Sequence, residues 1–243
     1  MTKPVFAAYA IAAYAVFLAT FLYLVAFVAG WPIVPHTVDH GPAAPLAGAL
    51  AIDAALIALF GVQHSIMARQ GFKRGWARIV PAPIERSTYM LFACAALILM
   101  FLLWRPISTP IWHVEARWAT VLIWALFAAG WLIVLLSTFL INHFELFGLQ
   151  QVYHHWRGVA AAAPKLRQPL FYRLVRHPLY SGFFLAFWAT PAMTGGHLLL
   201  ALGLSAYMLI AIRYEERDLV RLFGTDYEDY RRRVGMLTPR RAR

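Results

Sequence analysis

Residues 118–141 read WATVLIWALFAAGWLIVLLSTFLI, a stretch that contains no charged side chain. An α-helix needs about 20 predominantly apolar residues to cross the hydrocarbon core of a bilayer, so this stretch is long enough to span one. Three further apolar stretches of membrane length precede it, at about 5–31, 46–67 and 87–104. Their alternation with polar loops predicts an all-α, polytopic membrane helix bundle.

Two shorter apolar stretches follow, at about 179–194 and 197–212, with Pro191 and Gly195-Gly196 between them. We expect them to form a helical hairpin that crosses the membrane fully or only in part, which gives five or six crossings in all. From Tyr214 to Val234, apolar or aromatic residues recur at helical spacing and predict a C-terminal helix on the cytoplasmic surface.

Composition supports a membrane protein. Hydrophobic residues make up 61% of the chain, charged residues 14%, and the mean hydropathy is +0.61. Soluble domains contain about 45–50% apolar and about 25% charged residues. We find no internal repeat and no low-complexity linker, so residues 1–243 are expected to form a single integral-membrane domain.

The net charge of +11 is distributed unevenly along the chain. All but two of the 22 lysines and arginines, the exceptions being Arg105 and Arg117, fall on one side of the alternating topology. Cytoplasmic loops carry such an excess, so both termini are expected in the cytoplasm. The basic charge then meets anionic lipid headgroups rather than nucleic acid, for which no base-reading motif is present.

Two polar patterns flank the hairpin. The first is Arg176-His177-Pro178-x-Tyr180-x-Gly182, and the second is EExxLxxxFGxxYxxY from Glu215 to Tyr230. Charged side chains beside membrane-length apolar sequence are expensive and usually functional.

Together these patterns resemble the C-terminal cofactor-binding region of the isoprenylcysteine carboxyl methyltransferase superfamily, which are integral-membrane S-adenosylmethionine methyltransferases. Three upstream segments (QHSxMAR from Gln63, PxERSxY from Pro83 and NHFELFGL from Asn142) are similar to the NnrU-like branch, which contains bacterial methanethiol S-methyltransferases. This resemblance, over roughly residues 60–240, implies S-adenosylmethionine bound on the cytoplasmic side of a bacterial inner membrane. It also implies transfer of the methyl group to a small thiol, most simply methanethiol, giving dimethyl sulfide.

The resemblance places the cofactor-binding region at about residues 143–240. Arg176 and His177 can donate to the cofactor carboxylate, and a carboxylate of Glu215 or Glu216 can accept from its ammonium or ribose. Pro178 sets the entry of the following helix. Aromatic faces and hydroxyls for adenine or the sulfonium come from three tyrosines: Tyr172, Tyr180 and Tyr227.

Each of these residues has a structural alternative. Arg176 can be an interfacial anchor, and the two glutamates can pair with neighbouring arginines, namely Arg213, Arg217 and Arg221. Tyr227 and Tyr230 can be packing residues.

A thiol attacks as the thiolate, so a nearby base would assist the reaction. Three titratable residues at cytoplasmic helix ends are the candidates: His64, His143 and Glu145. A hydrogen-bonded structural role is the alternative for each.

Four other functions compete with thiol methylation. Nine histidines could ligate haem or a metal, but no pair sits one or two turns apart on a crossing helix. Cys94, the only cysteine, excludes an intrachain disulfide and a cysteine-based metal site. A transporter is disfavoured because intramembrane charges line no continuous path. Methylation of a lipid-borne carboxylate or amine, and a non-enzymatic accessory role in nitrogen-oxide metabolism, stay open.

Overall fold

The computed structural model describes residues 2–160 and 165–240, and it is almost entirely helical. Within these residues, five helical segments are long and apolar enough to cross a membrane: α1 (Lys3–Ala29), α2 (Leu46–Met67), Ala82–Leu103, α5 (Arg117–Ile141) and α9 (Gly195–Phe223). The third comprises the short helix η1 (Ala82–Ile84) and α4 (Glu85–Leu103). The predicted all-α, polytopic membrane fold is therefore confirmed.

The chain forms two compact units. Unit 1 comprises Met1–Ile111, Phe144–Ala162 and Met193–Gly203, and unit 2 comprises Trp112–His143, Ala163–Ala192 and Leu204–Arg243. The remaining elements are short: α3 (Gln70–Trp76), β1 (Pro110–His113), α6 (His143–Leu146), α7 (Leu149–Arg157), η2 (Leu170–Arg173), α8 (Pro178–Trp188), β2 (Ala192–Thr194) and α10 (Thr225–Arg233).

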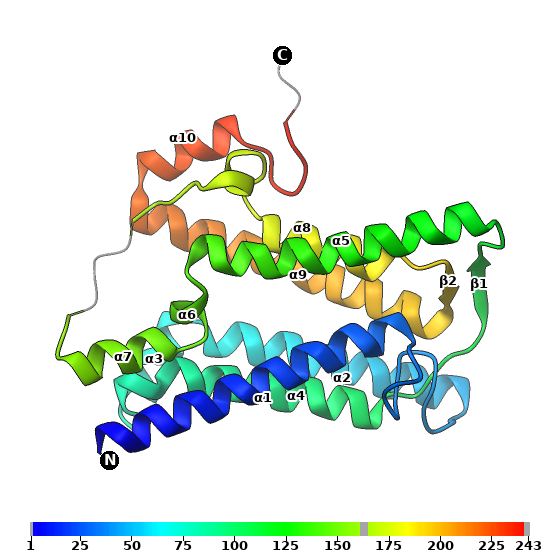
Figure 1. Cartoon of the computed structure of the whole chain (residues 1–243), viewed down its shortest axis with the longest axis horizontal. Helices are drawn as coiled ribbons and strands as arrows, with labels where there is room; N and C mark the ends of the chain where they lie inside the picture. Colours follow the sequence, from blue (N-terminus) through cyan, green and yellow to red (C-terminus); the bar gives the residue numbers. More distant parts are fainter. Residues whose placement is uncertain (1, 161–164, 241–243) are drawn as a thin grey trace. The chain divides into compact units, whose positions relative to one another are not determined.

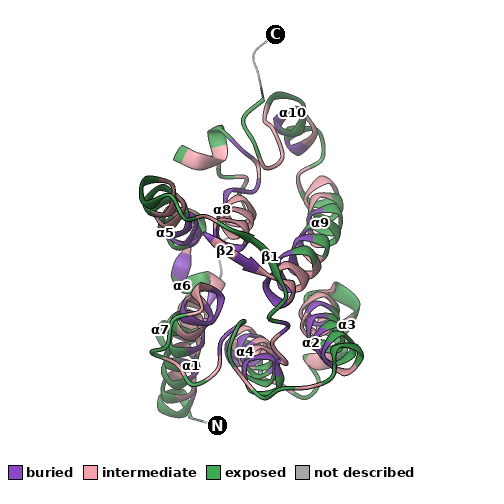
Figure 2. Cartoon of the chain, turned by 90° about the vertical axis from the view of Figure 1, so that its right-hand side faces the viewer, coloured by how far each residue is buried: buried purple, intermediate pink, exposed green. Residues whose placement is uncertain are grey.

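In unit 1, α1, α2 and α4 lie side by side (Figure 1). Figure 2 shows the helices nearly end-on, with buried and exposed residues on different sides of each. The exposed sides carry large apolar side chains such as Leu22 and Leu102, as expected for helices whose solvent is lipid. Asp53 is the one buried carboxylate among this unit's described residues. Its Oδ1 accepts a hydrogen bond of 2.9 Å from the Arg105 amide, which compensates part of the cost of burying it, whereas Oδ2 has no hydrogen-bond partner there.

In unit 2, α5 and α8 pack closely along their length (Figure 1). Gly130 and Gly182 make this approach possible, because a Cβ on Gly130 would lie 2.8 Å from the Gly182 carbonyl oxygen. A Cβ on Gly182 would likewise lie 2.7 Å from the Gly130 carbonyl oxygen. The hydrophobic effect does not drive helices together within lipid, so membrane helices associate largely through close van der Waals packing. Small residues at the contact allow the backbones to approach closely enough for it.

The expected hairpin is asymmetric. At 11 residues, α8 covers only about half of a bilayer core as helix, whereas α9 has 29 residues and is longer than the core. The chain turns after α8, where the Thr190 amide donates to the Trp188 carbonyl at 3.0 Å. The Val114 amide then donates to the Pro191 carbonyl at 2.8 Å, beyond the N-terminal end of α5. The hairpin thus pairs a short helix, which is not among the five membrane-length segments, with one long enough to cross a bilayer.

The predicted helix from Tyr214 to Val234 is also wrong as a single element. Gly224 adopts φ +56° and interrupts the helix, so that α9 ends before it and the separate helix α10 begins after it. A left-handed backbone costs little at glycine and more at other residues, so the helix ends where the sequence has its glycine. Glu215 and Glu216 consequently belong to the last turns of the long helix α9 and not to the tail helix.

Candidate functional site

The Arg176-His177-Pro178 turn lies where η2 has ended and α8 begins. His177 is the residue before the first helical position, its carbonyl accepts the Ser181 amide at 3.0 Å, and Pro178 occupies that first position. Proline fits there because its fixed φ suits a helix and its missing N–H would have no helical partner. The sequence thus places Arg176 and His177 at a helix entry.

Glu216 of α9 meets both side chains of this turn. Arg176 Nε donates to Glu216 Oε1 at 2.7 Å, and His177 Nε2 lies 3.1 Å from the same oxygen. Glu215 is more distant, with its Oε2 4.0 Å from His177 Nδ1, and its side chain is 46% exposed against 12% for Glu216. Neither of the two close bonds uses Glu216 Oε2.

The Arg176–Glu216 ion pair argues against the alternative in which the two glutamates form ion pairs with neighbouring arginines of α9. Arg221 pairs with Asp218 at 3.4 Å, one turn away on the exposed surface. The Arg176 side chain is 10% exposed and that of His177 is 4% exposed. The buried Arg176 guanidinium and Glu216 carboxylate require each other, because removing one partner leaves the other buried and uncompensated.

Four tyrosines surround the cluster. The Tyr230 hydroxyl donates to the Tyr172 carbonyl at 2.5 Å, which ties α10 to η2, and the Tyr180 ring lies 5.7 Å from the His177 ring. Tyr227 is 1% exposed, and its hydroxyl has no hydrogen-bond partner within residues 2–160 and 165–240. An unsatisfied buried hydroxyl costs about 1–3 kcal/mol and calls for an explanation.

The phenols of Tyr172, Tyr227 and Tyr230 remain protonated at neutral pH. Burial, followed by the nearby Glu216 carboxylate, raises the pKa of Tyr227, and burial raises the pKa of Tyr172. Burial raises the pKa of Tyr230 to about 12, against an opposing effect of the Arg176 guanidinium. The Tyr227 hydroxyl is therefore a hydrogen-bond donor beside a carboxylate and a guanidinium.

All eight residues predicted for the cofactor lie in unit 2: Tyr172, Arg176, His177, Pro178, Tyr180, Glu215, Glu216 and Tyr227. They come from η2, α8, α9, α10 and the turn between η2 and α8. Two further residues contact the cluster. Tyr230 belongs to the second motif, where a ligand role and a packing role were both open, and Ser181 lies inside the first motif, where no role was predicted for it.

The candidate bases are distributed over both units. His64 lies in the last turns of α2, in unit 1, where its ring is 5.4 Å from the Phe60 ring and 5.0 Å from that of Tyr89. The Tyr89 hydroxyl donates to the His64 carbonyl at 3.2 Å, and the Arg86 guanidinium lies over the Tyr89 ring. His64 is thus held in an aromatic setting beside a cation.

His143 belongs to unit 2, the unit of the Arg176 cluster. Its Nδ1 lies 2.8 Å from the Thr138 hydroxyl, and its ring stacks on Phe139 at 4.0 Å. Burial lowers the pKa of His143, so the imidazole is neutral at pH 7 and able to accept a proton. Glu145 is exposed in unit 1, and its backbone carbonyl accepts the Gln151 side-chain amide at 3.0 Å.

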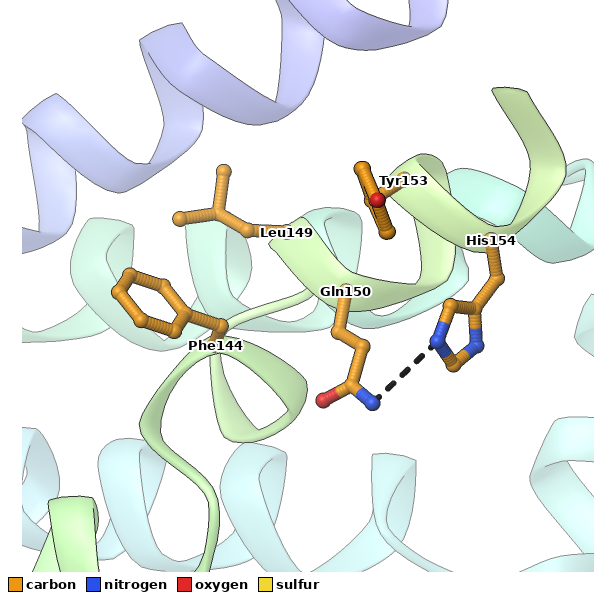
Figure 3. A pocket seen from close by; sticks show the side chains of 5 residues that line it. All are labelled: Phe144, Leu149, Gln150, Tyr153 and His154. Atoms are coloured by element: carbon orange, nitrogen blue, oxygen red, sulfur yellow. Dashed lines mark hydrogen bonds between the residues drawn. The ribbon is translucent and has the colours of Figure 1, made fainter. Parts of the chain in front are cut away.

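Unit 1 also contains an open pocket on α6 and α7, formed by Phe144, Leu149, Gln150, Tyr153 and His154. Figure 3 shows the Gln150 amide directed at the His154 ring, with 3.4 Å between the two nitrogens, beside three apolar or aromatic side chains. The three candidate bases are not among these lining residues. No group of three or more metal-ligating side chains occurs in the part of the chain that the structure describes.

Fold and site define a multi-pass α-helical membrane protein with an arginine–histidine–glutamate cluster at a helix entry. No family model and no solved structure matches the sequence. The chain is 53% identical over 231 residues to the methanethiol S-methyltransferase of Mycobacterium tuberculosis. The aligned region covers 95% of this chain and 94% of that protein. The chain is 51% identical to the methanethiol S-methyltransferase of a Pseudomonas species, covering 96% and 89%.

The chain therefore belongs to the methanethiol S-methyltransferase family, which confirms the resemblance found in the motifs. Similarity extends further to nurim from Rattus norvegicus, which is 31% identical over 179 residues, 70% of this chain and 68% of nurim.

Proposed function

We propose that this protein transfers a methyl group from S-adenosylmethionine to methanethiol and produces dimethyl sulfide. The observation that carries the proposal is an identity of 53% and 51%, over nearly the whole chain, to two proteins named methanethiol S-methyltransferase. The same identities favour a small thiol over a lipid-borne carboxylate or amine, and an enzyme over an accessory protein.

The Arg176 cluster fits the methyl donor, whose amino-acid part carries both a carboxylate and an ammonium group. Arg176 and His177 are donors for the carboxylate, and Glu216 Oε2 is an acceptor for the ammonium or ribose, since neither short bond uses that oxygen. The buried Tyr227 hydroxyl is a donor that finds no acceptor among the described residues, as expected of a group that binds a ligand atom. Tyr180 and Tyr172 offer aromatic faces.

S-adenosylmethionine supplies an electrophilic methyl group, so that displacement by thiolate forms one C–S bond, breaks another and leaves dimethyl sulfide and S-adenosylhomocysteine. The chain's own residues must align the thiolate with that methyl group, exclude water and accept the thiol proton. His64, His143 and Glu145 are the proposed acceptors. Of these, His143 lies in the unit that contains the Arg176 cluster, and burial keeps it neutral.

We place the protein in a bacterial inner membrane with both termini in the cytoplasm. The support is the distribution of lysine and arginine, together with five membrane-capable helices and the shorter helix α8, which we take as a sixth passage. The donor cluster then lies on the cytoplasmic side, where S-adenosylmethionine is made.

Product formation tests the function. Purified protein in detergent or nanodiscs is incubated with methyl-labelled S-adenosylmethionine and methanethiol, and volatile label is trapped and identified. We expect labelled dimethyl sulfide with methanethiol and no labelled product with an isoprenylated cysteine or a phospholipid amine. Label that partitions into lipid, with none in the volatile fraction, would refute the thiol specificity.

Calorimetry tests the donor site. The change His177→Ala should weaken S-adenosylmethionine binding at least tenfold, about 1.4 kcal/mol. Tyr227→Phe should weaken it about 2- to 12-fold, the equivalent of one hydrogen bond of about 0.5–1.5 kcal/mol, because only the hydroxyl is lost. Unchanged affinity in both variants, with the fold intact, would remove this cluster from the donor site.

A further inference from the structure

The segment Val234–Leu237, which we name the C-terminal strap, lies against the Arg176-His177 turn. Val175 and Gly235 form a parallel bridge, the Arg176 amide donates to the Gly235 carbonyl at 2.8 Å, and the His177 amide donates to the Met236 carbonyl at 3.1 Å. Both motif residues are therefore attached by their backbones to a segment nearly 60 residues further along the chain. Strand-like pairing of this kind fixes the direction in which each side chain leaves the backbone.

Side chains strengthen the attachment. Arg176 Nη1 donates to the Val234 carbonyl at 2.5 Å, while Nε of the same guanidinium faces Glu216. Because the guanidinium is planar and its N–H groups have fixed directions, anchoring Nη1 also sets the direction of Nε. Ser181 Oγ lies 2.8 Å from the Leu237 carbonyl and 3.1 Å from the His177 carbonyl, so it joins the end of the strap to the start of α8.

Gly235 makes the strap's path possible. A Cβ at this position would overlap the backbone carbonyl oxygen of Thr238 and lie 3.1 Å from the Arg240 amide nitrogen. The chain folds back on itself immediately after the strap, and no other residue type leaves room for that turn. Backbone atoms cannot rotate away as a flexible side chain can, so a substitution here must displace the strap.

We propose that the C-terminal strap is a positioning element of the methyl-donor site, which rests on the donor site proposed above. Its backbone carbonyls orient Arg176 and His177, and its own side chains take no part in binding. A displacement of about 1 Å in a binding or catalytic group can cost about 100-fold in rate, which is why a segment that touches no ligand can control the site.

The test compares Gly235→Ala and Ser181→Ala with Ser181→Thr, which keeps the hydroxyl, and with Gly48→Ala. Gly48 is a matched glycine control, since a Cβ there meets no atom within 4 Å. S-adenosylmethionine affinity, the KM for each substrate and the melting temperature are measured on the full chain. Hydrogen exchange reports the amides of Arg176 and His177.

We expect Gly235→Ala to weaken donor binding at least tenfold and raise the donor KM, with the KM for methanethiol unchanged and faster exchange at both amides. Ser181→Ala should weaken donor binding by a smaller factor and Ser181→Thr should restore it, because threonine keeps the hydroxyl that bonds the Leu237 carbonyl of the strap. Gly48→Ala should behave as the unmodified protein.

Wild-type donor affinity in Gly235→Ala, or equal increases in both KM values together with early melting, would overturn the proposal. If Gly235→Ala does not fold, the donor affinities of Ser181→Ala and Ser181→Thr provide the test. Failure of Ser181→Thr to restore donor binding then overturns the proposal. The His177→Ala variant distinguishes a failure of the proposed donor site from a failure of the strap inference. If it binds the donor normally, the donor site itself is wrong; if it binds weakly while the strap variants bind normally, only the strap inference is wrong.

Discussion

At the residue scale, the central feature is that two donors from one turn converge on one oxygen of Glu216. Hydrogen bonds that involve a charged group contribute about 1.5–3 kcal/mol each, roughly twice the neutral value. The geometry distinguishes two adjacent glutamates that are chemically identical. Glu216 is directed into the cluster, whereas Glu215 is half exposed and 4.0 Å from its nearest partner there.

This difference leads to a prediction for the pair. Glu216→Gln keeps the shape of the side chain and removes its charge, so it should weaken S-adenosylmethionine binding at least tenfold, about 1.4 kcal/mol. Glu215→Gln is the matched control and should change affinity less than about threefold. Calorimetry on both variants provides the measurement. A loss of affinity confined to Glu215→Gln would mean that the wrong carboxylate was assigned.

A second prediction at this scale concerns the proton acceptor. His64→Asn should lower turnover by about 100- to 10,000-fold, the usual contribution of a general base, with donor affinity and melting temperature nearly unchanged. A higher pH should partly restore the rate, because more thiol is then ionised in solution. His143→Asn serves as the comparison in the same assay. Normal turnover in His64→Asn, with a slow His143→Asn, would assign the base to His143.

At the scale of elements, the α5–α8 contact depends on two glycines that let the backbones approach. Gly182→Leu would place a side chain where a Cβ already comes within 2.9 Å of the Val134 side chain and backbone. Overpacking a tight contact costs about 1–3 kcal/mol or more, so this variant should melt several degrees lower in detergent.

The control for this prediction is Gly48→Leu on α2, where a Cβ meets no atom within 4 Å. It should melt within a degree or so of the unmodified protein. If both variants melt alike, close packing of α5 on α8 is not what stabilises unit 2.

At the scale of the whole molecule, the number of passages determines where the termini lie. Single cysteines are introduced at Thr2, His40 and Asp226, all exposed, in a chain whose buried Cys94 is replaced by alanine. In intact spheroplasts, a membrane-impermeant maleimide should label the variant at His40 and should label those at Thr2 and Asp226 only after lysis. Labelling of Thr2 and Asp226 from opposite sides would mean an odd number of passages.

The sequence by itself determined the class of fold and the identity of the motif. Hydropathy acts locally, so stretches such as 118–141 reveal membrane helices without knowledge of their neighbours. The positions of Arg176, His177 and Pro178 at a helix entry were equally predictable, because proline constrains its own backbone and that of the preceding residue.

The tertiary structure alone decided which of these residues meet. Glu216 reaches Arg176 across 40 residues of chain only because of how the end of α9 is rotated relative to α8, and packing sets that rotation. The strap at Gly235 and the unsatisfied Tyr227 hydroxyl depend in the same way on contacts between distant segments. Hydrophobic periodicity records which face of a helix is buried, but it carries no information about which partner that face will meet.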